Sequence, residues 1–365
     1  MPEFLQASIQ VLLGIGLLFG GGELFVQGSV AMAVIFGIPQ LVIGLTVVSL
    51  GTSAPELFVS LSSVLQGADA LAVSNVVGSN IFNVMVVLGS SALVMPLRVE
   101  SRLVRRDVPL LITVSAAVWG MASTGRVTWQ SGAALLLALV INSIWEIRTA
   151  REEPEGVEDA EPDVNPEQGK QGVGKALLSL LLGIVLLGVG SKVLVDGASG
   201  AATVLGVSKA VIGLTIVSAG TGMPELITSL VAAVKGRTDL AIGNVVGSNI
   251  LNQLLVLGAS AVAASGKGGL EVGALLIERD MPVMVITTLA CLPIFWTKGL
   301  ITRLEGGILL GLYIFYVVDQ VLPRTLPTWQ DEFRLVVLCV VLPTVIVLIV
   351  TQAVVYWRQL RRNRP

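Results

Sequence analysis

The 365-residue chain contains no histidine. Histidine is the commonest general base and a frequent zinc ligand, so its absence excludes His-dependent hydrolysis and zinc-protease chemistry. Cysteine is scarce as well: Cys291 and Cys339 are the only two, and both lie in apolar runs. We expect them to pack as small hydrophobic side chains rather than to form a disulfide.

Charge is also scarce. Charged residues make up 13% of the chain, whereas soluble domains carry about 25%. Hydrophobic residues make up 54%, and the mean hydropathy is +0.86. The composition therefore predicts an all-α polytopic membrane protein that lies in a lipid bilayer and has no nucleic-acid partner. The first ten residues lack a basic region and a small-residue cleavage site, so we expect the first apolar run to stay as a membrane span.

Two phrases of the sequence occur twice. IGLTVVSLGTSAPEL at 43–57 and IGLTIVSAGTGMPEL at 212–226 share eleven of fifteen residues at an offset of 169. The same offset relates NVVGSNIFN at 75–83 to NVVGSNILN at 244–252. Self-similarity at a fixed period is the signature of a repeat, so the chain is a tandem duplication.

Apolar runs of about twenty residues predict eleven membrane helices. They fall near 5–34, 41–65, 70–95, 107–124, 128–148, 175–204, 210–234, 239–264, 280–297, 301–318 and 334–357. Each half has five crossings, an odd number, so the second half enters the bilayer from the opposite side. The fold class is thus two inverted-topology five-helix repeats, ten helices in all, plus an eleventh C-terminal helix.

The domain boundaries follow from this pattern. The first repeat covers 1–148 with its motif at 43–83, and the second covers 175–318 with its motif at 212–252. Between them, 149–174 is rich in acids, Pro and Gly, which favours a disordered cytoplasmic linker. A regulatory divalent-cation site is the alternative, although the acids lack the spacing of an EF-hand loop. The remainder, 319–365, holds the extra helix and a basic tail.

Lysine and arginine counts in the loops predict the orientation. With the N-terminus outside, sixteen basic residues fall on the inner side and six on the outer side. We therefore expect an integral protein of the plasma (inner) membrane with its N-terminus outside and its C-terminus in the cytoplasm.

Each copy of the first phrase places a glutamate, Glu56 or Glu225, inside an apolar run. A carboxylate at the bilayer centre costs about 2.5–3.5 kcal/mol on insertion scales, so it is expected to serve a function. The preceding Pro55 and Pro224 lack an N–H and must kink or unwind the helix there, which frees backbone oxygens. Carboxylate, carbonyl, hydroxyl and amide oxygens are the ligands that Ca²⁺ and Na⁺ prefer.

Further oxygen ligands lie close to the glutamates in the sequence. The first phrases offer Ser49, Thr52, Ser53, Ser218 and Thr221. The second phrases place polar residues at i, i+4 and i+8 along one helix face, namely Asn75, Ser79, Asn83, Asn244, Ser248 and Asn252. Such residues also join membrane helices, and for Asn75 and Asn244 that structural role is an equal alternative.

Two carboxylates in one buried site cannot both stay ionised without a positive charge between them. Neither phrase contains Lys or Arg. The counter-charge must therefore be a bound cation or protons, which is the electrostatic basis of antiport. Asp107 and Asp280 open corresponding helices of the two halves, and we expect them to act as N-caps, with a gating role as the alternative.

GTSAPEL and GTGMPEL, each followed by GSNIxN, resemble the paired alpha repeats of the Ca²⁺/cation antiporter superfamily, specifically its Na⁺/Ca²⁺ exchanger branch. The likeness covers about 320 residues and both repeats. It implies a ten-helix inverted-repeat fold and exchange of Ca²⁺ for Na⁺, with no cofactor and no enzyme activity.

The resemblance also implies roles for individual residues. Glu56 and Glu225 would be the shared carboxylates, and Thr52 and Thr221 would offer carbonyls to Ca²⁺. The flanking Na⁺ sites would use Ser53, Ser79, Ser248 and the carbonyls of Ser49 and Ser218, with Asn83 lining the centre.

Two positions depart from the family pattern. Gly222 stands where the second repeat usually has a serine, and Asn252 stands where many members have an aspartate. Asn252 argues against K⁺ co-transport, and both departures leave the Na⁺ stoichiometry open. The H⁺-coupled branch, which typically has Asn where this chain has Thr52, is the alternative family assignment.

Two other classes of function compete with antiport. A passive cation channel would use the same acids but would not need two proline-broken copies of the motif. An intramembrane hydrolase is disfavoured because the chain has no histidine, no Ser/Lys pair and no paired aspartates at membrane depth. The sequence does not indicate an oligomeric state.

Overall fold

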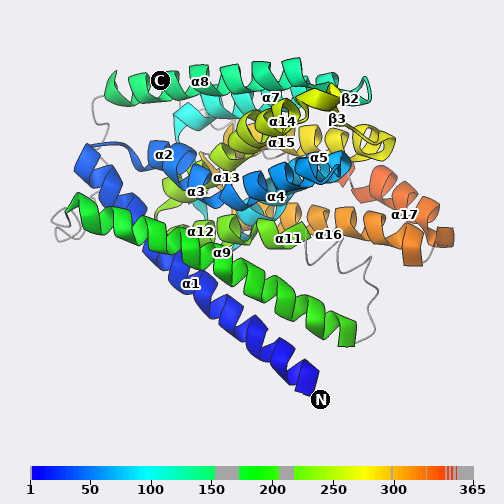
Figure 1. Cartoon of the computed structure of the whole chain (residues 1–365), viewed down its shortest axis with the longest axis horizontal. Helices are drawn as coiled ribbons and strands as arrows, with labels where there is room; N and C mark the ends of the chain where they lie inside the picture. Colours follow the sequence, from blue (N-terminus) through cyan, green and yellow to red (C-terminus); the bar gives the residue numbers. More distant parts are fainter. Residues whose placement is uncertain are drawn as a thin grey trace.

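The computed structural model describes residues 2–152, 172–204, 218–296, 299–325, 327–341 and the single positions 343, 344, 347 and 351. This part of the chain is mainly helical (Figure 1). The helices are α1 Pro2–Phe36, α2 Gln40–Ile43, α3 Ser49–Thr52, α4 Ala54–Leu65, α5 Asp69–Phe82, α6 Gly89–Val94, α7 Val108–Ala122, α8 Trp129–Glu152, α9 Val173–Val204, α11 Ser218–Thr221, α12 Met223–Val234, α13 Thr238–Leu251, α14 Gly258–Ala263, α15 Met281–Trp296, α16 Arg303–Thr325 and α17 Gln330–Val336.

Short irregular elements join these helices. π-helical turns cover Gly44–Val48, Asn83–Leu88, Leu103–Asp107, Asn252–Leu257, Leu276–Asp280 and Val337–Val341. Two 3₁₀ turns cover Ser265–Lys267 and Pro327–Trp329. The strands are β1 Leu97–Arg98, β2 Arg126–Thr128, β3 Gly269–Glu271 and β4 Leu300–Ile301. Four of the π-helical turns form two pairs at corresponding places in the two halves, immediately after α5 and α13 and immediately before α7 and α15.

The long helices α1 and α9 pack closely side by side (Figure 1). Glycines repeat every seven residues along the contact, and the two sets match at the repeat offset of 169: Gly14, Gly21 and Gly28 on α1, and Gly183, Gly190 and Gly197 on α9. A Cβ on any of the six would lie 2.6–2.9 Å from an atom of the other helix. Gly14 faces Leu194 and Gly28 faces Leu180, so the helices are antiparallel. Small residues let membrane helices approach in this way.

The first motif is broken at the expected place. The helix over 40–52 meets α4 at an angle of 43°, and Ser53 between them leaves the α-helical region with φ −81° and ψ 3°. Gly222, at the same place in the second half, has φ −81° and ψ 2° and precedes α12. The predicted kink beside Pro55 and Pro224 is confirmed. Residues 205–217 of the second motif lie outside the described residues.

The short strands pair between the two halves. β1 pairs with β4 and β2 pairs with β3, both antiparallel. Trp119, near the end of α7, also donates its indole N–H to the carbonyl of Ile277, just before α15, at 3.0 Å. The end of α7 thus lies beside the start of α15 and the start of α7 beside the end of α15, so these helices are antiparallel and Asp107 and Asp280 lie at opposite ends of the pair.

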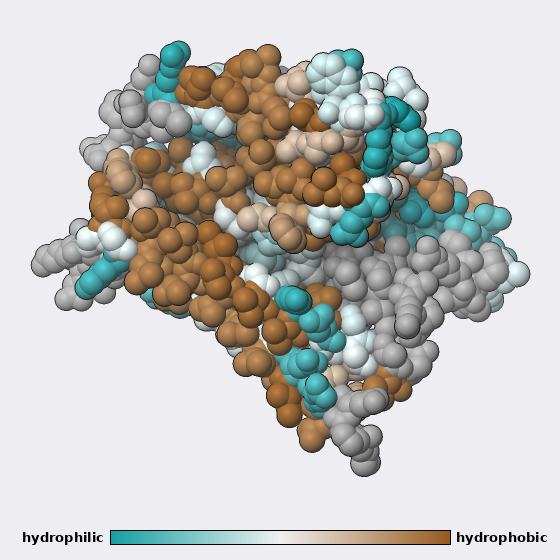
Figure 2. Space-filling model, viewed as in Figure 1, coloured by the Kyte–Doolittle hydropathy of each residue, from teal (hydrophilic) through white to brown (hydrophobic). Residues whose placement is uncertain are grey.

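Six helices in the described residues are long and apolar enough to cross a membrane, or seven if the bent pair Gln40–Thr52 and Ala54–Leu65 forms one span. Apolar side chains dominate the surface over α1 and α9 (Figure 2). The count of eleven stays a prediction, because most of 334–357 and part of 210–234 lie outside the described residues. Helix also enters both ends of the predicted linker, since α8 continues to Glu152 and α9 begins at Val173.

Two sequence expectations need correction. Asp107 precedes α7 but its side chain makes no capping hydrogen bond, and instead faces Arg102 and Arg106 at 3.9 and 3.8 Å. Asp280 likewise binds Arg279. An adjacent guanidinium competes better than a helix N–H for a buried carboxylate. Both cysteines are free rather than joined in a disulfide, as expected, but Cys339 is exposed, so the expected burial holds for Cys291 alone.

Candidate functional site

Glu56 and Glu225 occupy the first turn of α4 and α12, directly after the two breaks. Both side chains are fully buried, and Ser53, three residues before Glu56, donates a hydrogen bond to Glu225 across the two halves. The duplicated motif therefore brings one carboxylate from each half into a shared interior. The proline at the second position of each helix explains the geometry, because it starts a new helix whose first turn carries the acid.

Hydroxyl groups connect the two halves around these acids. Ser53 donates from its Oγ to Glu225 Oε1 at 3.4 Å. The Thr52 hydroxyl donates to Asn244 Oδ1 at 3.0 Å and lies 3.3 Å from the Ser248 hydroxyl. Ser53 therefore contacts Glu225, and Thr52 contacts Ser248 and Asn244 across the two halves. That these residues bind ions stays a prediction.

Asn75 and Asn244 hold the broken helices in place. Asn75 Nδ2 donates to the backbone carbonyl of Glu56 at 3.2 Å and to Ser60 Oγ at 3.0 Å. Asn244 Nδ2 makes the same two bonds, to the carbonyl of Glu225 at 3.3 Å and to Ser229 Oγ at 2.9 Å. This favours the structural role for both asparagines, since they satisfy carbonyl oxygens that a membrane interior cannot solvate.

Asn83 and Asn252 each open a π-helical turn and are fully buried. π-helical turns are rare and are frequent at functional sites. Polar atoms gather here without hydrogen-bond partners in the described part of the chain: both carboxylate oxygens of Glu56, Oε2 of Glu225, Oγ1 of Thr221, and the amide oxygens and nitrogens of Asn83 and Asn252. Buried polar atoms normally have partners, so such a cluster indicates a place for a ligand.

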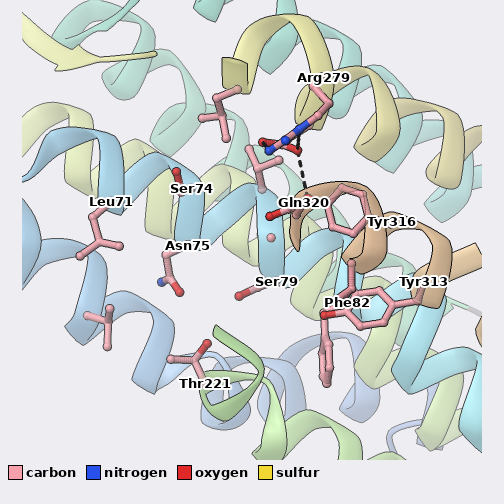
Figure 3. Close-up of a pocket in the computed structure, with 16 residues that line it drawn as sticks. Leu71, Ser74, Asn75, Ser79, Phe82, Thr221, Arg279, Tyr313, Tyr316 and Gln320 are labelled. Atoms are coloured by element: carbon pink, nitrogen blue, oxygen red, sulfur yellow. Dashed lines mark hydrogen bonds and ion pairs between the residues drawn. The ribbon is translucent and has the colours of Figure 1, made fainter. Parts of the chain in front are cut away.

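The remaining predicted residues occupy different places. Ser49 is buried, and its hydroxyl donates to the carbonyls of Gly44 at 2.6 Å and Asn244 at 3.1 Å. The carbonyl of Ser49 accepts the Ser53 N–H at 2.9 Å, so it stays within the helical turn. Ser218 opens α11, but its side chain is not among those described. Ser79 and Thr221 face each other from α5 and α11 (Figure 3), and the Thr221 hydroxyl has no hydrogen-bond partner in the described residues.

A cavity of about 370 Å³ adjoins this site. One part of it is lined by Ser79 and Thr221, and another part by Arg279, Tyr316 and Gln320 (Figure 3). The lining thus changes from two hydroxyl-bearing residues of the repeated motifs to a charged cluster around Arg279.

The site contains one contact that the motifs did not predict. Phe82, the last residue of α5, lies against Gly222 and packs edge-on against Tyr313, with ring centroids 5.7 Å apart. A signal existed in the sequence, because Phe82 is the single difference between the two nine-residue phrases. Its contact with Gly222 could not be read from the sequence, since it joins different helices.

The oxygen ligands of this site suit a cation that binds reversibly. Among the described residues, no group of three or more His, Cys, Asp or Glu side chains could hold a metal. Two carboxylates with surrounding hydroxyl and amide oxygens match the preference of hard cations for oxygen ligands. Few charged ligands give weaker binding than the acid-rich sites of resident metal ions.

The buried polar site within apolar helices defines an integral all-α polytopic membrane protein that carries ions. The family model of the sodium/calcium exchanger protein matches residues 7–147 and 175–322, and the chain belongs to this family. It is a cation antiporter of the Na⁺/Ca²⁺ exchanger type, within the Ca²⁺/cation antiporter superfamily. This is a family of transporters rather than enzymes.

Individual relatives agree with this placement. The chain is 39% identical over 321 residues to the putative antiporter CaxA of Alkalimonas amylolytica, covering 86% of this chain and 98% of the relative. It is 30% identical to the sodium/calcium exchanger MaX1 of Methanosarcina acetivorans, covering 84% and 96%. A solved structure of the sodium-calcium exchanger NCX_Mj matches with a TM-score of 0.72 and 32% identity, over 86% of this chain and 98% of that chain.

Proposed function

We propose that this protein exchanges Ca²⁺ for Na⁺ around Glu56 and Glu225. The observation that carries the proposal is the set of buried oxygen atoms on these acids that have no hydrogen-bond partner in the described residues. Neither duplicated phrase contains a lysine or arginine that could pair with these acids. An unpaired buried charge is strongly destabilising, and a bound cation removes that penalty.

Coupling follows from the shared carboxylates. One Ca²⁺ balances their two negative charges, and monovalent cations can balance the same charges in its absence. Because both ions need the same oxygens, binding of one excludes the other. A site that is always occupied by one ion or the other supports exchange rather than free passage.

We also propose that the two halves are inverted repeats that open the site alternately to each side. The matching hydrogen bonds of Asn75 and Asn244 and the reciprocal strand pairs between the halves support this symmetry. Such repeats allow alternating access around a fixed midplane site. The distribution of Lys and Arg supports an outer N-terminus and a cytoplasmic C-terminus in the plasma (inner) membrane.

The test is Ca²⁺ uptake into proteoliposomes under an imposed Na⁺ gradient. Glu56→Gln and Glu225→Gln should each lower the exchange rate at least about 100-fold, because each removes half of the charge that binds Ca²⁺. Glu278→Gln makes the same change at an exposed position and should leave exchange intact. Size-exclusion profiles must show that the variants remain folded.

Three outcomes would contradict the proposal. Full exchange in both site variants would remove the glutamates from the mechanism. Uptake driven by a pH gradient and not by Na⁺ would assign H⁺ as the counter-ion. Uptake without any counter-ion gradient would indicate a channel.

A further inference from the structure

The two halves of the site differ at two positions that touch each other. Phe82 in the first half corresponds to Leu251 in the second, and Ser53 in the first half corresponds to Gly222 in the second. Phe82 and Gly222 are in contact across the halves. We call these two residue pairs the half-sites. The first half-site has Ser53 and Leu251, and the second has Gly222 and Phe82.

Position 222 needs glycine because there is no room for a side chain, and not because of its backbone conformation. Its φ of −81° is the same as that of Ser53, and any L-residue adopts this conformation. A Cβ on Gly222, however, would lie 2.6 Å from Cδ1 of Phe82. The phenylalanine ring fills the space that a serine side chain would need.

This exchange of residues removes a ligand from one acid. The Ser53 hydroxyl reaches Glu225 at 3.4 Å, whereas Gly222 has no hydroxyl to offer Glu56. Both oxygens of Glu56 lack hydrogen-bond partners in the described residues, and the Phe82 ring, which is only 6% exposed, fills the space beside Gly222 where a hydroxyl would lie. An apolar ring cannot coordinate Na⁺, which needs oxygen ligands in place of its water.

Charge balance is a second reason to expect fewer Na⁺ ions in the site. Two carboxylates balance two monovalent cations, and a third would leave a net positive charge in a buried site. A third cation would need additional neutral oxygens to offset that charge. At Gly222 the hydroxyl that Ser53 supplies in the other half is missing.

We propose that the Phe82–Gly222 pair sets the coupling ratio of exchange by removing one Na⁺ site. The protein then moves about two Na⁺ for each Ca²⁺, so that exchange carries no net charge. This inference rests on the proposed function, because it concerns how many Na⁺ ions return through the same site.

The coupling ratio can be measured in proteoliposomes with the membrane potential clamped at zero. For each of several Na⁺ gradients, one determines the Ca²⁺ gradient at which there is no net Ca²⁺ flux. The logarithm of the Ca²⁺ concentration ratio is then plotted against the logarithm of the Na⁺ concentration ratio, and the slope is the number of Na⁺ ions exchanged for each Ca²⁺. The variants are F82L/G222S, which copies the first half-site into the second, and S53G/L251F, which does the reverse. F82L alone separates loss of the ring from gain of the hydroxyl.

The wild type should give a slope of about two, and F82L/G222S should raise it by about one. F82L alone should keep the wild-type slope, and S53G/L251F should lower it. A wild-type slope of three, or equal slopes in all variants, would overturn the inference. If F82L/G222S does not fold, the wild-type slope and S53G/L251F still decide. Absence of any Na⁺-driven Ca²⁺ flux in the wild type would instead refute the proposed function.

Discussion

The two ends of the antiparallel helix pair α7 and α15 carry related charges in different surroundings. At the first end, Glu146 binds Arg102 and lies 2.8 Å from Arg106, while Asp107 lies 3.8 Å from Arg106. Both acids are almost fully buried, and the Arg106 guanidinium stacks 4.2 Å from the ring centroid of Trp145. Two positive and two negative charges thus form a closed, balanced cluster.

At the second end, a single ion pair faces the cavity. Arg279 binds Asp280 through two contacts of 2.8 and 3.1 Å, and the Tyr316 hydroxyl donates to Asp280 at 3.1 Å. All three residues line the cavity, together with Gln320 (Figure 3).

The repeat explains this difference. Gly132 on α8 and Gly306 on α16 make equivalent close contacts, to the carbonyls of Gly258 and Gly89, which fixes an offset of 174 for these helices. Gln320 then corresponds to Glu146. Before α15 the offset is 173, because Arg279 corresponds to Arg106. At this offset Leu275 corresponds to Arg102. The two halves thus share a backbone frame, but the end where the cavity lies has leucine and glutamine in place of one ion pair.

The largest expected effect comes from breaking the closed cluster. Glu146→Gln removes the carboxylate that binds both Arg102 and Arg106, so the free energy of unfolding should fall by about 3–5 kcal/mol. R102L/E146Q, which copies the second end, should recover much of that loss. Thermal unfolding in detergent measures both, with Arg105→Leu at an exposed position as the control. Equal destabilisation by the single and double variants would contradict the comparison.

A smaller effect is expected at the second end. Tyr316→Phe removes one hydrogen bond to the Asp280 carboxylate. The free energy of unfolding should fall by no more than about 1.5–3 kcal/mol, because Arg279 still binds Asp280. Unfolding in the same detergent gives the value. A loss as large as that of Glu146→Gln would show that the two ends are equally dependent on their charges.

The smallest effect is expected where α17 meets α16. Arg334 binds Asp319 at 2.6 Å, but the arginine side chain is 42% exposed. Exposed ion pairs contribute about 0.2–1 kcal/mol, so Arg334→Gln should lower stability by no more than that, and less at high salt. Unfolding at low and high salt concentration tests this. A larger and salt-independent loss would mean that the pair is buried in the membrane.

The duplicated motifs predicted the centre of the molecule well. The breaks at Ser53 and Gly222 follow from proline chemistry, which is local, and the burial of Glu56 and Glu225 follows from their place in apolar runs. That Glu56 and Glu225 bind ions stays a prediction, since the structure shows their burial and unpaired oxygens and not a bound cation.

Contacts between distant segments could not be predicted in the same way. Asp107 was expected to cap a helix, although the two arginines that it faces stand next to it in the sequence. What the sequence does not show is that Glu146, on another helix, joins the same two arginines. The ring of Phe82 against Gly222 is likewise a contact between helices. The glycines at Gly14 and Gly183 were readable at the repeat offset, but their meaning depends on which helix they face.

The strand pairs between the halves have a consequence for biosynthesis. β1 ends at Arg98, but its partner β4 begins at Leu300, roughly 200 residues later, which takes about 10–40 s at ordinary rates of translation. During that interval the edge of β1 has no partner, and the glycine face of α1 has none until α9 has been made. The nascent first half must therefore wait in the bilayer, incompletely packed, until the second half arrives.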